Sequence, residues 1–315
     1  MDLYNIVNNN LVAMDSESFK LEKDIQNLIE SNTDEVFGLQ FVSSEFALGD
    51  FRLDTLCFDE ENSSFVIIEY KRGSSYSVID QGYSYLSLML NNKSDFILEY
   101  NEKRSVSLKR TDVNWQGSRI IFVSPSFNTY QKNSVNFKDV PFELWEIRKF
   151  GGGLVALDNH KPTSKESIQN ISPTDSMIGT VSKEVKVYKD EDVLAKTGDT
   201  IIELWRELKE KLFALDNVDF VAQSSYIKFT KNNKGVCYFN FRKDKIKGEI
   251  IRGNVNADGS KSKNFFVIDD PKNICREYNF TYKSGVEGHR YLFDINETSD
   301  LDYLEMLIRQ KYKAL

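Results

Sequence analysis

The chain has 315 residues, of which 40% are hydrophobic and 28% charged, and its formal net charge at pH 7 is -7. This composition is typical of a folded protein that is long enough for two domains. No apolar run approaches the ~18 residues that a membrane helix needs. The first residues also lack the basic flank and apolar run of a secretion signal. We therefore expect a cytoplasmic protein with no membrane segment.

Cysteine and histidine are scarce. The three cysteines, Cys57, Cys237 and Cys275, form no CxxC pair, so the sequence suggests neither a disulfide framework nor a zinc site. The two histidines, His160 and His289, are too few for a histidine-ligated metal centre or a Ser-His-Asp triad. Any catalysis must therefore depend on carboxylates and lysine.

The charge is unevenly distributed along the chain. Residues 1–155 contain 15 Lys and Arg against 23 Asp and Glu, whereas 228–263 contains ten basic residues and three acidic ones. A local basic surface matters more for nucleic-acid binding than the sign of the whole chain. The acidic first half is unlike a DNA-binding surface, except where a bound metal ion neutralises acidic side chains.

The first half predicts a helix, a meander of three strands, a second helix and three further strands. Apolar residues at helical spacing indicate the helices, and short runs bounded by turn residues indicate the strands. The expected helices cover 19–31 and 76–91, and the expected strands cover 38–48, 51–59, 64–71, 96–99, 119–123 and 142–147. Four basic residues are expected around one hairpin: Lys103, Arg104, Lys109 and Arg110.

A segment rich in Ser, Thr, Asn, Pro and Lys separates this half from a second domain. It has almost no periodic apolar signal, so we interpret 156–192 as a linker between a domain at 1–155 and a domain at 193–315. The second domain predicts helices at 200–215 and 301–312, and strands at 226–230, 236–242, 246–251, 264–268 and 290–294. We expect a smaller α+β domain there.

Three acidic or basic groups of the first half are predicted to converge. Residues two apart in a strand point to one face, so Glu69 and Lys71 emerge together while the Tyr70 side chain turns away. If Asp54 lies on the neighbouring strand, two carboxylates, an ammonium and the Tyr70 carbonyl meet at the end of the sheet. Carboxylate and carbonyl oxygens suit Mg²⁺ or Mn²⁺. Such a site can hydrolyse a phosphodiester, with Lys71 acting on water or on transition-state charge.

The order of these motifs resembles a known superfamily. Glu22 on a helix, the tripeptide RLD that ends at Asp54, the Glu69-x-Lys71 pair after the apolar run FVII, and Gln81-xxx-Tyr85 are similar to the PD-(D/E)XK, or restriction-endonuclease-like, superfamily. The closest branch has the Q-xxx-Y motif and includes RecB-type and NucS-like mismatch endonucleases. This resemblance implies an α/β fold, a mixed β-sheet core flanked by helices, followed here by a smaller C-terminal α+β domain.

The same resemblance implies roles for individual residues. Asp54, Glu69 and the Tyr70 carbonyl would bind the metal, and Lys71 would be the catalytic lysine. Glu22 would be an outer-shell or second-metal carboxylate, although a solvated helix position is an alternative. Gln81 and Tyr85 would support the site or the substrate, and Tyr85 is equally compatible with a core position. Arg52 is interpreted either as a phosphate contact or as a structural partner of Glu45.

The C-terminal domain shows no catalytic grouping. Its strands carry basic residues interleaved with aromatic ones, a pattern that suits single-stranded nucleic acid or simply a half-buried sheet with a charged outer face. The basic residues are Lys228, Lys231, Arg242, Lys243, Lys245 and Lys247. The whole chain also resembles an uncharacterised bacterial family, some of whose members are labelled predicted transport proteins, a label that nothing else in the sequence supports.

The first interpretation is a Mg²⁺- or Mn²⁺-dependent nuclease that cleaves DNA, double- or single-stranded, in repair, restriction or defence. The alternative is a catalytically inactive nuclease-like fold that acts as a nucleic-acid or protein interaction module. The intact set of Asp54, Glu69 and Lys71 favours the first. A protein partner at the C-terminal domain and a homodimer are left open, as are specificity and the mode of cleavage.

Overall fold

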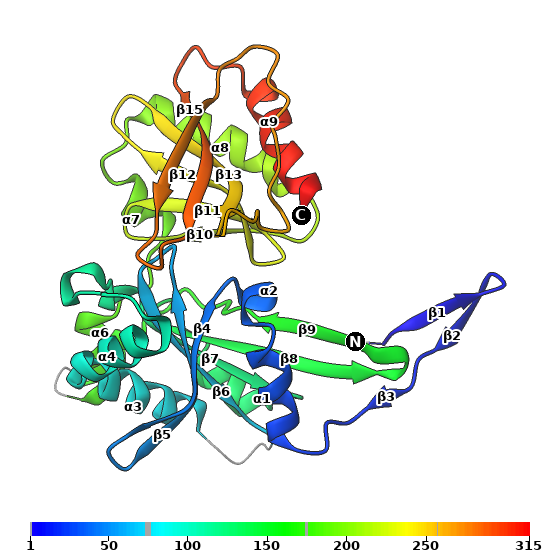
Figure 1. Ribbon diagram of the computed structural model, residues 1–315, viewed down its shortest axis with the longest axis vertical. Helices are drawn as coiled ribbons and strands as arrows, with labels where there is room; N and C mark the ends of the chain where they lie inside the picture. Colours follow the sequence, from blue (N-terminus) through cyan, green and yellow to red (C-terminus); the bar gives the residue numbers. More distant parts are fainter. Residues whose placement is uncertain (1, 73–76, 174–175, 257) are drawn as a thin grey trace. The chain divides into compact units, whose positions relative to one another are not determined.

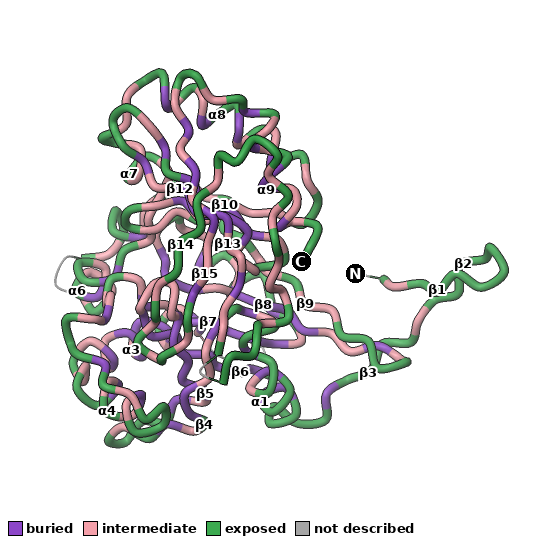
Figure 2. Tube along the Cα trace, turned by 45° about the horizontal axis from the view of Figure 1, so that its top comes forward, coloured by how far each residue is buried: buried purple, intermediate pink, exposed green. Residues whose placement is uncertain are grey.

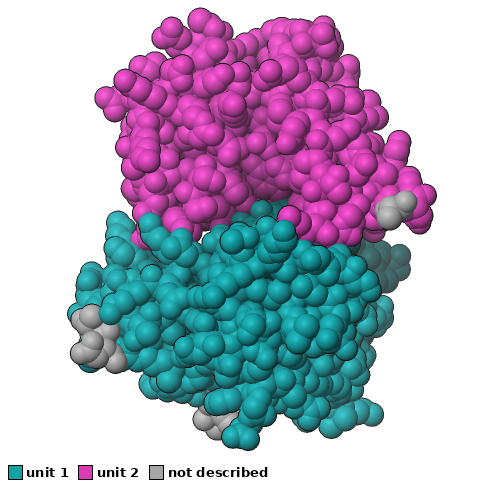
Figure 3. All heavy atoms as spheres, turned by 60° about the vertical axis from the view of Figure 1, so that its left-hand side comes forward, with its two compact units in different colours: residues 1–187 teal, residues 188–315 magenta. Residues whose placement is uncertain are grey.

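The computed structural model describes residues 2–72, 77–173, 176–256 and 258–315. The chain divides into two compact units, Met1–Val187 and Tyr188–Leu315, which Figure 3 distinguishes by colour. Each unit has its own hydrophobic core. Over the described residues, no helix is both long and apolar enough to cross a lipid bilayer.

Unit 1 is built on a mixed sheet, which has seven strands over the described residues. Strands β4, β5 and β6 form an antiparallel meander. Strand β7 pairs in parallel with β6, and β8 pairs in parallel with β7. Both β9 and the short β3 pair antiparallel with β8. The bounds are β3 (Ser16–Glu17), β4 (Gln40–Leu48), β5 (Phe51–Asp59), β6 (Ser64–Tyr70), β7 (Arg119–Ser124), β8 (Phe142–Phe150) and β9 (Leu154–His160).

Helices cover both faces of this sheet (Figure 1). On one face, Ile25 and Ile29 of α1 pack with Ile68 and Val123 of the central strands. On the other face, Leu86 of α3 lies in the second core of the unit. Strand β6 is buried on both sides, as expected for a central strand that reads as a continuous apolar run. The helices are α1 (Glu22–Glu30), α2 (Thr33–Phe37), α3 (Val78–Asn91), α4 (Lys93–Arg104), α5 (Thr129–Ser134) and α6 (Met177–Glu184).

The strand predicted at 96–99 is wrong, because these residues lie inside helix α4. Phe96 and Tyr100, four residues apart, both point into the core, which is helical spacing. The end of α4 also replaces the hairpin that was expected around the four basic residues from Lys103 to Arg110. Residue 76, the first of the helix predicted at 76–91, lies outside the described residues.

The segment predicted as a linker, 156–192, is instead largely part of unit 1. It completes β9, forms the short helix η4 (Ile168–Asn170) and forms α6. Ile168, Val181 and Val185 are buried in the same core as α3. Ile168 stands alone in a polar sequence, whereas Val181 and Val185 follow Ile178 at helical spacing, a short signal that the sequence analysis missed. The boundary between the units therefore falls after Val187.

An N-terminal hairpin precedes the sheet of unit 1. Strands β1 (Tyr4–Val7) and β2 (Asn10–Ala13) pair only with each other over the described residues, and Asn8 and Asn9 form the turn with positive φ angles of 50° and 63°. Every residue of the two strands is exposed (Figure 2), including Ile6 at 77% and Leu11 at 70%. The hairpin therefore buries none of its apolar side chains.

Unit 2 is a six-stranded antiparallel sheet over the described residues, with its strands in the order β10-β11-β12-β13-β15-β14. Helices α8 and α9 cover one face, where Trp205 and Leu307 pack with Phe239 and Ile250. The expected strand at 264–268 is wrong, because this segment forms no strand. The bounds are α7 (Asp190–Leu194), α8 (Asp199–Phe213), β10 (Val218–Ala222), β11 (Tyr226–Lys231), β12 (Lys234–Phe241), β13 (Ile246–Val255), β14 (Arg276–Thr281), β15 (Glu287–Ile295) and α9 (Leu301–Ala314).

Both units agree with the predicted fold class. Unit 1 is an α/β fold with a mixed sheet flanked by helices, and unit 2 is a smaller α+β fold. Six strands of the described residues were not predicted: β1, β2, β3, β9, β10 and β14. Strand β14 is almost entirely exposed, so it carries no alternation of buried and exposed residues from which it could be recognised.

Candidate active site

The register of β5 and β6 sets Asp54 against Glu69. Thr55 pairs with Ile68, and Leu56 pairs with Ile67. Continuing this register by one residue places Asp54 opposite Glu69, on the same face of the sheet. The paired main chains stop at this point, and the Asp54 carboxylate accepts the N–H of Tyr70 at 3.0 Å.

One oxygen of Glu69 is surrounded by hydrogen-bond donors. Its Oε1 accepts bonds from Lys71 Nζ at 2.7 Å, from Gln81 Nε2 at 2.6 Å and from Tyr85 Oη at 3.3 Å. Gln81 and Tyr85 lie four residues apart on α3, so one face of that helix presents both. Gln81 also donates to Tyr85 Oη at 2.9 Å. The predicted motif residues Glu69, Lys71, Gln81 and Tyr85 are therefore in direct contact.

The second oxygen of Glu69 has a different environment. Glu69 is only 3% exposed, and its Oε2 is buried with no hydrogen-bond partner in the described part of the chain. A buried carboxylate oxygen without a partner is costly. A cation at this oxygen would remove that cost.

The charge environment of Asp54 also favours a bound cation. Burial, followed by the nearby charge of Glu69, raises the pKa of Asp54 to about 7. Two neighbouring carboxylates with one lysine leave an excess of negative charge, which a divalent cation would balance. No group of three or more His, Cys, Asp or Glu side chains within the described ranges forms a ready metal cage. Carboxylate oxygens are ligands that Mg²⁺ accepts, and a bound ion at Asp54 and Glu69 stays a prediction.

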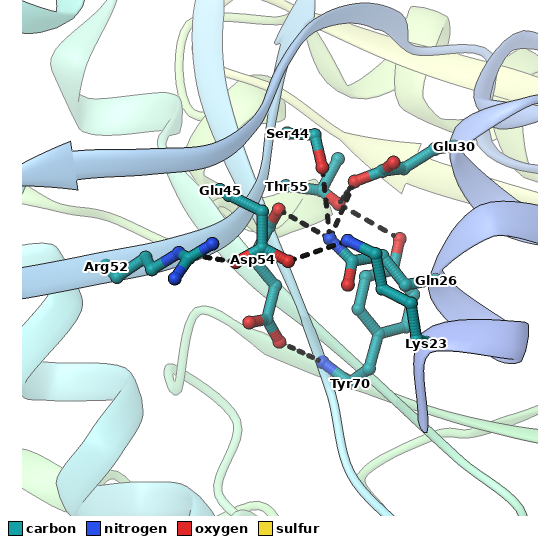
Figure 4. A network of polar contacts seen from close by, with 9 residues as sticks. All are labelled: Lys23, Gln26, Glu30, Ser44, Glu45, Arg52, Asp54, Thr55 and Tyr70. Atoms are coloured by element: carbon teal, nitrogen blue, oxygen red, sulfur yellow. Dashed lines mark hydrogen bonds and ion pairs between the residues drawn. The ribbon is translucent and has the colours of Figure 1, made fainter. Parts of the chain in front are cut away.

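Gln26 on α1 was missed by the sequence analysis. It is buried, and its Nε2 donates to the main-chain oxygen of Asp54 at 3.0 Å, to Ser44 Oγ at 3.2 Å and to Glu30 Oε1 at 2.9 Å (Figure 4). Thr55 Oγ1 in turn donates to Glu30 Oε1 at 2.6 Å. This network attaches α1 to the strand that carries Asp54.

Arg52 lies beside Glu45, as one of its two predicted roles requires. Arg52 Nε is 2.6 Å from Glu45 Oε2, and Lys23 Nζ is 2.7 Å from Glu45 Oε1 (Figure 4). A hydrogen bond from Lys23 is the largest of the effects that lower the pKa of Glu45. Glu45 has a φ angle of 55°, which is uncommon for a residue with a Cβ atom. The two ion pairs therefore hold an unusual backbone conformation next to the strand of Asp54.

Glu22 and Tyr70 occupy positions that only partly match their expected roles. Glu22 is the exposed first residue of α1, and its charge adds a smaller contribution that raises the pKa of Asp54. Tyr70 contacts Asp54 through its N–H group. Its carbonyl as a metal ligand, and Glu22 as an outer-shell carboxylate, stay predictions.

At least two of the six basic residues predicted as a nucleic-acid patch in unit 2 have partners within the unit. Lys231 Nζ donates to the main-chain oxygen of Tyr312 at 3.0 Å, and Lys245 forms an ion pair with Asp294 at 3.0 Å. The remaining four are distributed over β11, the turn between β12 and β13, and β13: Lys228, Arg242, Lys243 and Lys247. Their binding role stays a prediction.

Comparison with known proteins gives one relative that spans the whole chain. No protein-family model matches. A protein of Haemophilus influenzae, described as an uncharacterized protein, is 39% identical over an alignment of 315 positions that covers 99% of this chain and 100% of the relative. The shared region therefore includes both units.

Similar solved structures cover less of the chain. A complex of EndoMS with double-stranded DNA has 20% identity and a TM-score of 0.28, and the match covers 43% of this chain and 50% of that one. A repair endonuclease from Pyrococcus abyssi has 18% identity and a TM-score of 0.22, over 38% and 44% of the two chains. The chain thus spans half the length of these solved structures or less.

Proposed function

This chain belongs to the family of the Haemophilus influenzae protein, and from its own site we propose that it is a metal-dependent nuclease that hydrolyses phosphodiester bonds of DNA. The observation that carries the proposal is the buried, unpartnered Oε2 of Glu69, directly across the strand pair from Asp54. Carboxylates in this arrangement suit a divalent metal ion, and a lysine lies in contact with one of them.

Asp54 and Glu69 would hold the ion, which is Mg²⁺ or Mn²⁺. When bound, it supplies a water of lowered pKa and balances charge on the phosphate. The protein positions both ligands before the ion arrives, because the Tyr70 N–H fixes Asp54, and Gln81 and Tyr85 fix Glu69. Such preorganisation reduces the cost of assembling the site.

Lys71 supplies the remaining chemistry. Its ammonium is held 2.7 Å from Glu69 at the end of β6, and the Lys71 side chain is almost completely buried. A positive group held at this place can orient an attacking water and stabilise the charge that develops on the phosphate. Removing Lys71 should therefore affect the chemical step more than the folding of the chain.

The alternative is a nuclease-like fold that binds without cleaving. We favour cleavage over this alternative, because Glu69 contacts Lys71 and Gln81, and Asp54 accepts the N–H of Tyr70, the residue between Glu69 and Lys71. The two functions differ in one measurable property, which is metal-dependent turnover.

A cleavage panel tests the proposal. Plasmid, duplex and single-stranded oligonucleotides are incubated with the full chain in Mg²⁺, in Mn²⁺ or in EDTA. We expect products only with a metal, and none from Asp54→Asn or Glu69→Gln. Matched controls are Asp50→Asn and Glu102→Gln, which neutralise exposed carboxylates of the same unit. Products that persist in EDTA, or equal rates for the site and control variants, would contradict the proposal.

A further inference from the structure

A second charged group lies on the same edge of the sheet as the candidate site. Tyr70 pairs with Val123, so the next row contains Lys71 and Ser124, and Ser124 pairs with Glu146 of β8. Residues two apart in a strand share a face, so Glu146 is on the face that carries Glu69 and Lys71. Two strand spacings, about 10 Å in total, separate the Lys71 and Glu146 positions.

Glu146 holds two cations in fixed positions. Its Oε1 lies 2.7 Å from Lys132 Nζ, and its Oε2 lies 2.7 Å from Arg148 Nη2. The N–H of Phe127 also donates to Oε1 at 3.1 Å. Burial alone would raise the pKa of Glu146, but hydrogen bonds from Lys132, Phe127 and Arg148 lower it overall. The carboxylate therefore stays charged and keeps both cations in place.

The two cations of this group are accessible. The exposed Asp158 of β9 lies opposite Glu146 in the strand register, so the two cations face two carboxylates, of which only Glu146 is buried. Glu146 is buried, whereas the side chains of Lys132 and Arg148 are 31% and 38% exposed. An ammonium has three N–H donors and a guanidinium five, and each cation directs one of them at Glu146 in these contacts. The exposed parts can therefore meet an anion from solution.

We propose that Lys132 and Arg148, oriented by Glu146, bind a backbone phosphate of the nucleic acid beside the bond that is cut. This assignment rests on the proposed nuclease function, because it places the phosphate relative to Lys71. It also meets the objection that unit 1 is acidic, since two cations on the site's own edge matter more than the total charge of the unit. Guanidinium and ammonium groups are the usual partners of phosphate.

If Lys132, Arg148 and Glu146 only stabilise the fold, a different result is expected. Removing the two cations would then lower the stability of the fold and leave the salt dependence of nucleic-acid binding unchanged. A phosphate site instead contributes to that salt dependence, because each phosphate neutralised on duplex DNA adds about -0.9 to the slope of log affinity against log salt. The slope therefore separates the two roles.

The experiment measures binding of fluorescein-labelled duplex and single-stranded oligonucleotides by the full chain in EDTA, over a salt series. Lys132→Gln/Arg148→Gln is compared with Lys103→Gln/Lys149→Gln, which removes two cations elsewhere on unit 1. Lys149 is adjacent to Arg148 but points to the opposite face of β8, where it forms an ion pair with Glu17. We expect the slope to become less negative, by up to about two units, in the site variant alone.

A third variant tests whether impaired folding, and not the loss of a phosphate contact, explains a change in binding. Removal of both cations leaves Glu146 buried with less compensation, so Glu146→Gln/Lys132→Gln/Arg148→Gln removes the carboxylate charge as well. Both site variants should show the same reduced slope. Equal slopes for the site variants, the control and the parent would overturn the phosphate site.

The two proposals can fail separately. If the parent binds nucleic acid with a salt-sensitive affinity but cleaves nothing with Mg²⁺ or Mn²⁺, the nuclease function fails, and the phosphate site is still decided by the slopes. If the parent cleaves and the slopes are equal, only the phosphate site fails. A parent that neither binds nor cleaves overturns both.

Discussion

The Asp54 carboxylate accepts the N–H of Tyr70 at 3.0 Å, so a side chain takes the place that the main chain of β5 would fill in a regular ladder. The last pair of β5 and β6 is Thr55 with Ile68, so Asp54 and Glu69 lie directly beyond the paired residues. The hydrogen bond also fixes the orientation of one carboxylate by a backbone group, which cannot rotate away. The site is therefore formed where β5 and β6 stop pairing, although β6 still pairs with β7 there.

Asp54→Asn should abolish binding of Mn²⁺ while keeping the fold. The amide oxygen can still accept the Tyr70 N–H, but the charge that attracts the ion is lost. For the parent, an ion at a hundredfold excess over its dissociation constant should stabilise the folded state by about 2.7 kcal/mol. Titration calorimetry and thermal melts measure both effects, with Asp50→Asn as the control. Equal Mn²⁺ binding by the parent and Asp54→Asn would exclude Asp54 as a ligand.

Lys71→Met should lower the single-turnover cleavage rate by a factor of ~10² or more. The ammonium is expected to act on water and on transition-state charge, whereas Asp54 and Glu69 keep the metal. Binding of Mn²⁺ should therefore remain. Lys103→Met, which removes an exposed cation near the end of α4, is the matched control. If Lys71→Met cleaved at the rate of the parent, the catalytic assignment of Lys71 would be wrong.

Gln26→Leu should lower the free energy of unfolding of unit 1 by about 1 to 3 kcal/mol. The substitution leaves the Asp54 carbonyl and the Glu30 carboxylate without the donor that they share. Asn27 is the next residue of the same helix and is exposed, so Asn27→Leu should have little effect. Urea unfolding of both variants measures the difference. A similar loss in both would show that the network has no special role.

Because Lys311 of unit 2 is buried, we expect the free energy of unfolding to depend on pH. Lys311 is 2% exposed, and its Nζ donates to the main-chain oxygen of Asn264 at 2.7 Å. Burial lowers the pKa of Lys311 from its ordinary value of 10.5 to about 8. Between these values the unfolded chain binds a proton that the folded chain does not bind, so the free energy of unfolding rises with pH.

The comparison with Lys311→Met isolates this group from other titrating residues. From pH 8 to 10.5, the stability of the parent relative to Lys311→Met should rise by about 1 to 3 kcal/mol. Below pH 8 the difference should be constant, because Lys311 is charged in both states. The exposed Lys313 provides the control, since Lys313→Met should show no such change. Chemical unfolding at several pH values measures these differences.

The sequence predicted the central strands and the convergence of the motif residues, because both depend on local patterns. Alternation fixes which face Glu69 and Lys71 share, and a four-residue spacing fixes the common helix face of Gln81 and Tyr85. The catalytic roles of these residues stay predictions.

The residues that were missed depend on packing between distant segments. Helical spacing places Glu22 and Gln26 one turn apart, but only the packing of α1 on the sheet decides that Gln26 is buried. Glu146 lies in β8, where charged residues are interspersed among apolar ones without any motif, and its partners are Lys132 of α5 and Arg148, two residues further along the strand. Neither pattern could be recognised before the strand order was known.

The pairing of β3 with β8 brings Ser16 next to Phe150. During synthesis, this N-terminal strand must therefore wait until almost half of the chain has been made before its partner exists. Contacts between residues so distant in sequence slow folding, because a long loop must close before they form. Unit 2 draws all of its strands from the last part of the chain, after unit 1 is complete. Unit 1 can therefore finish folding while unit 2 is still being translated.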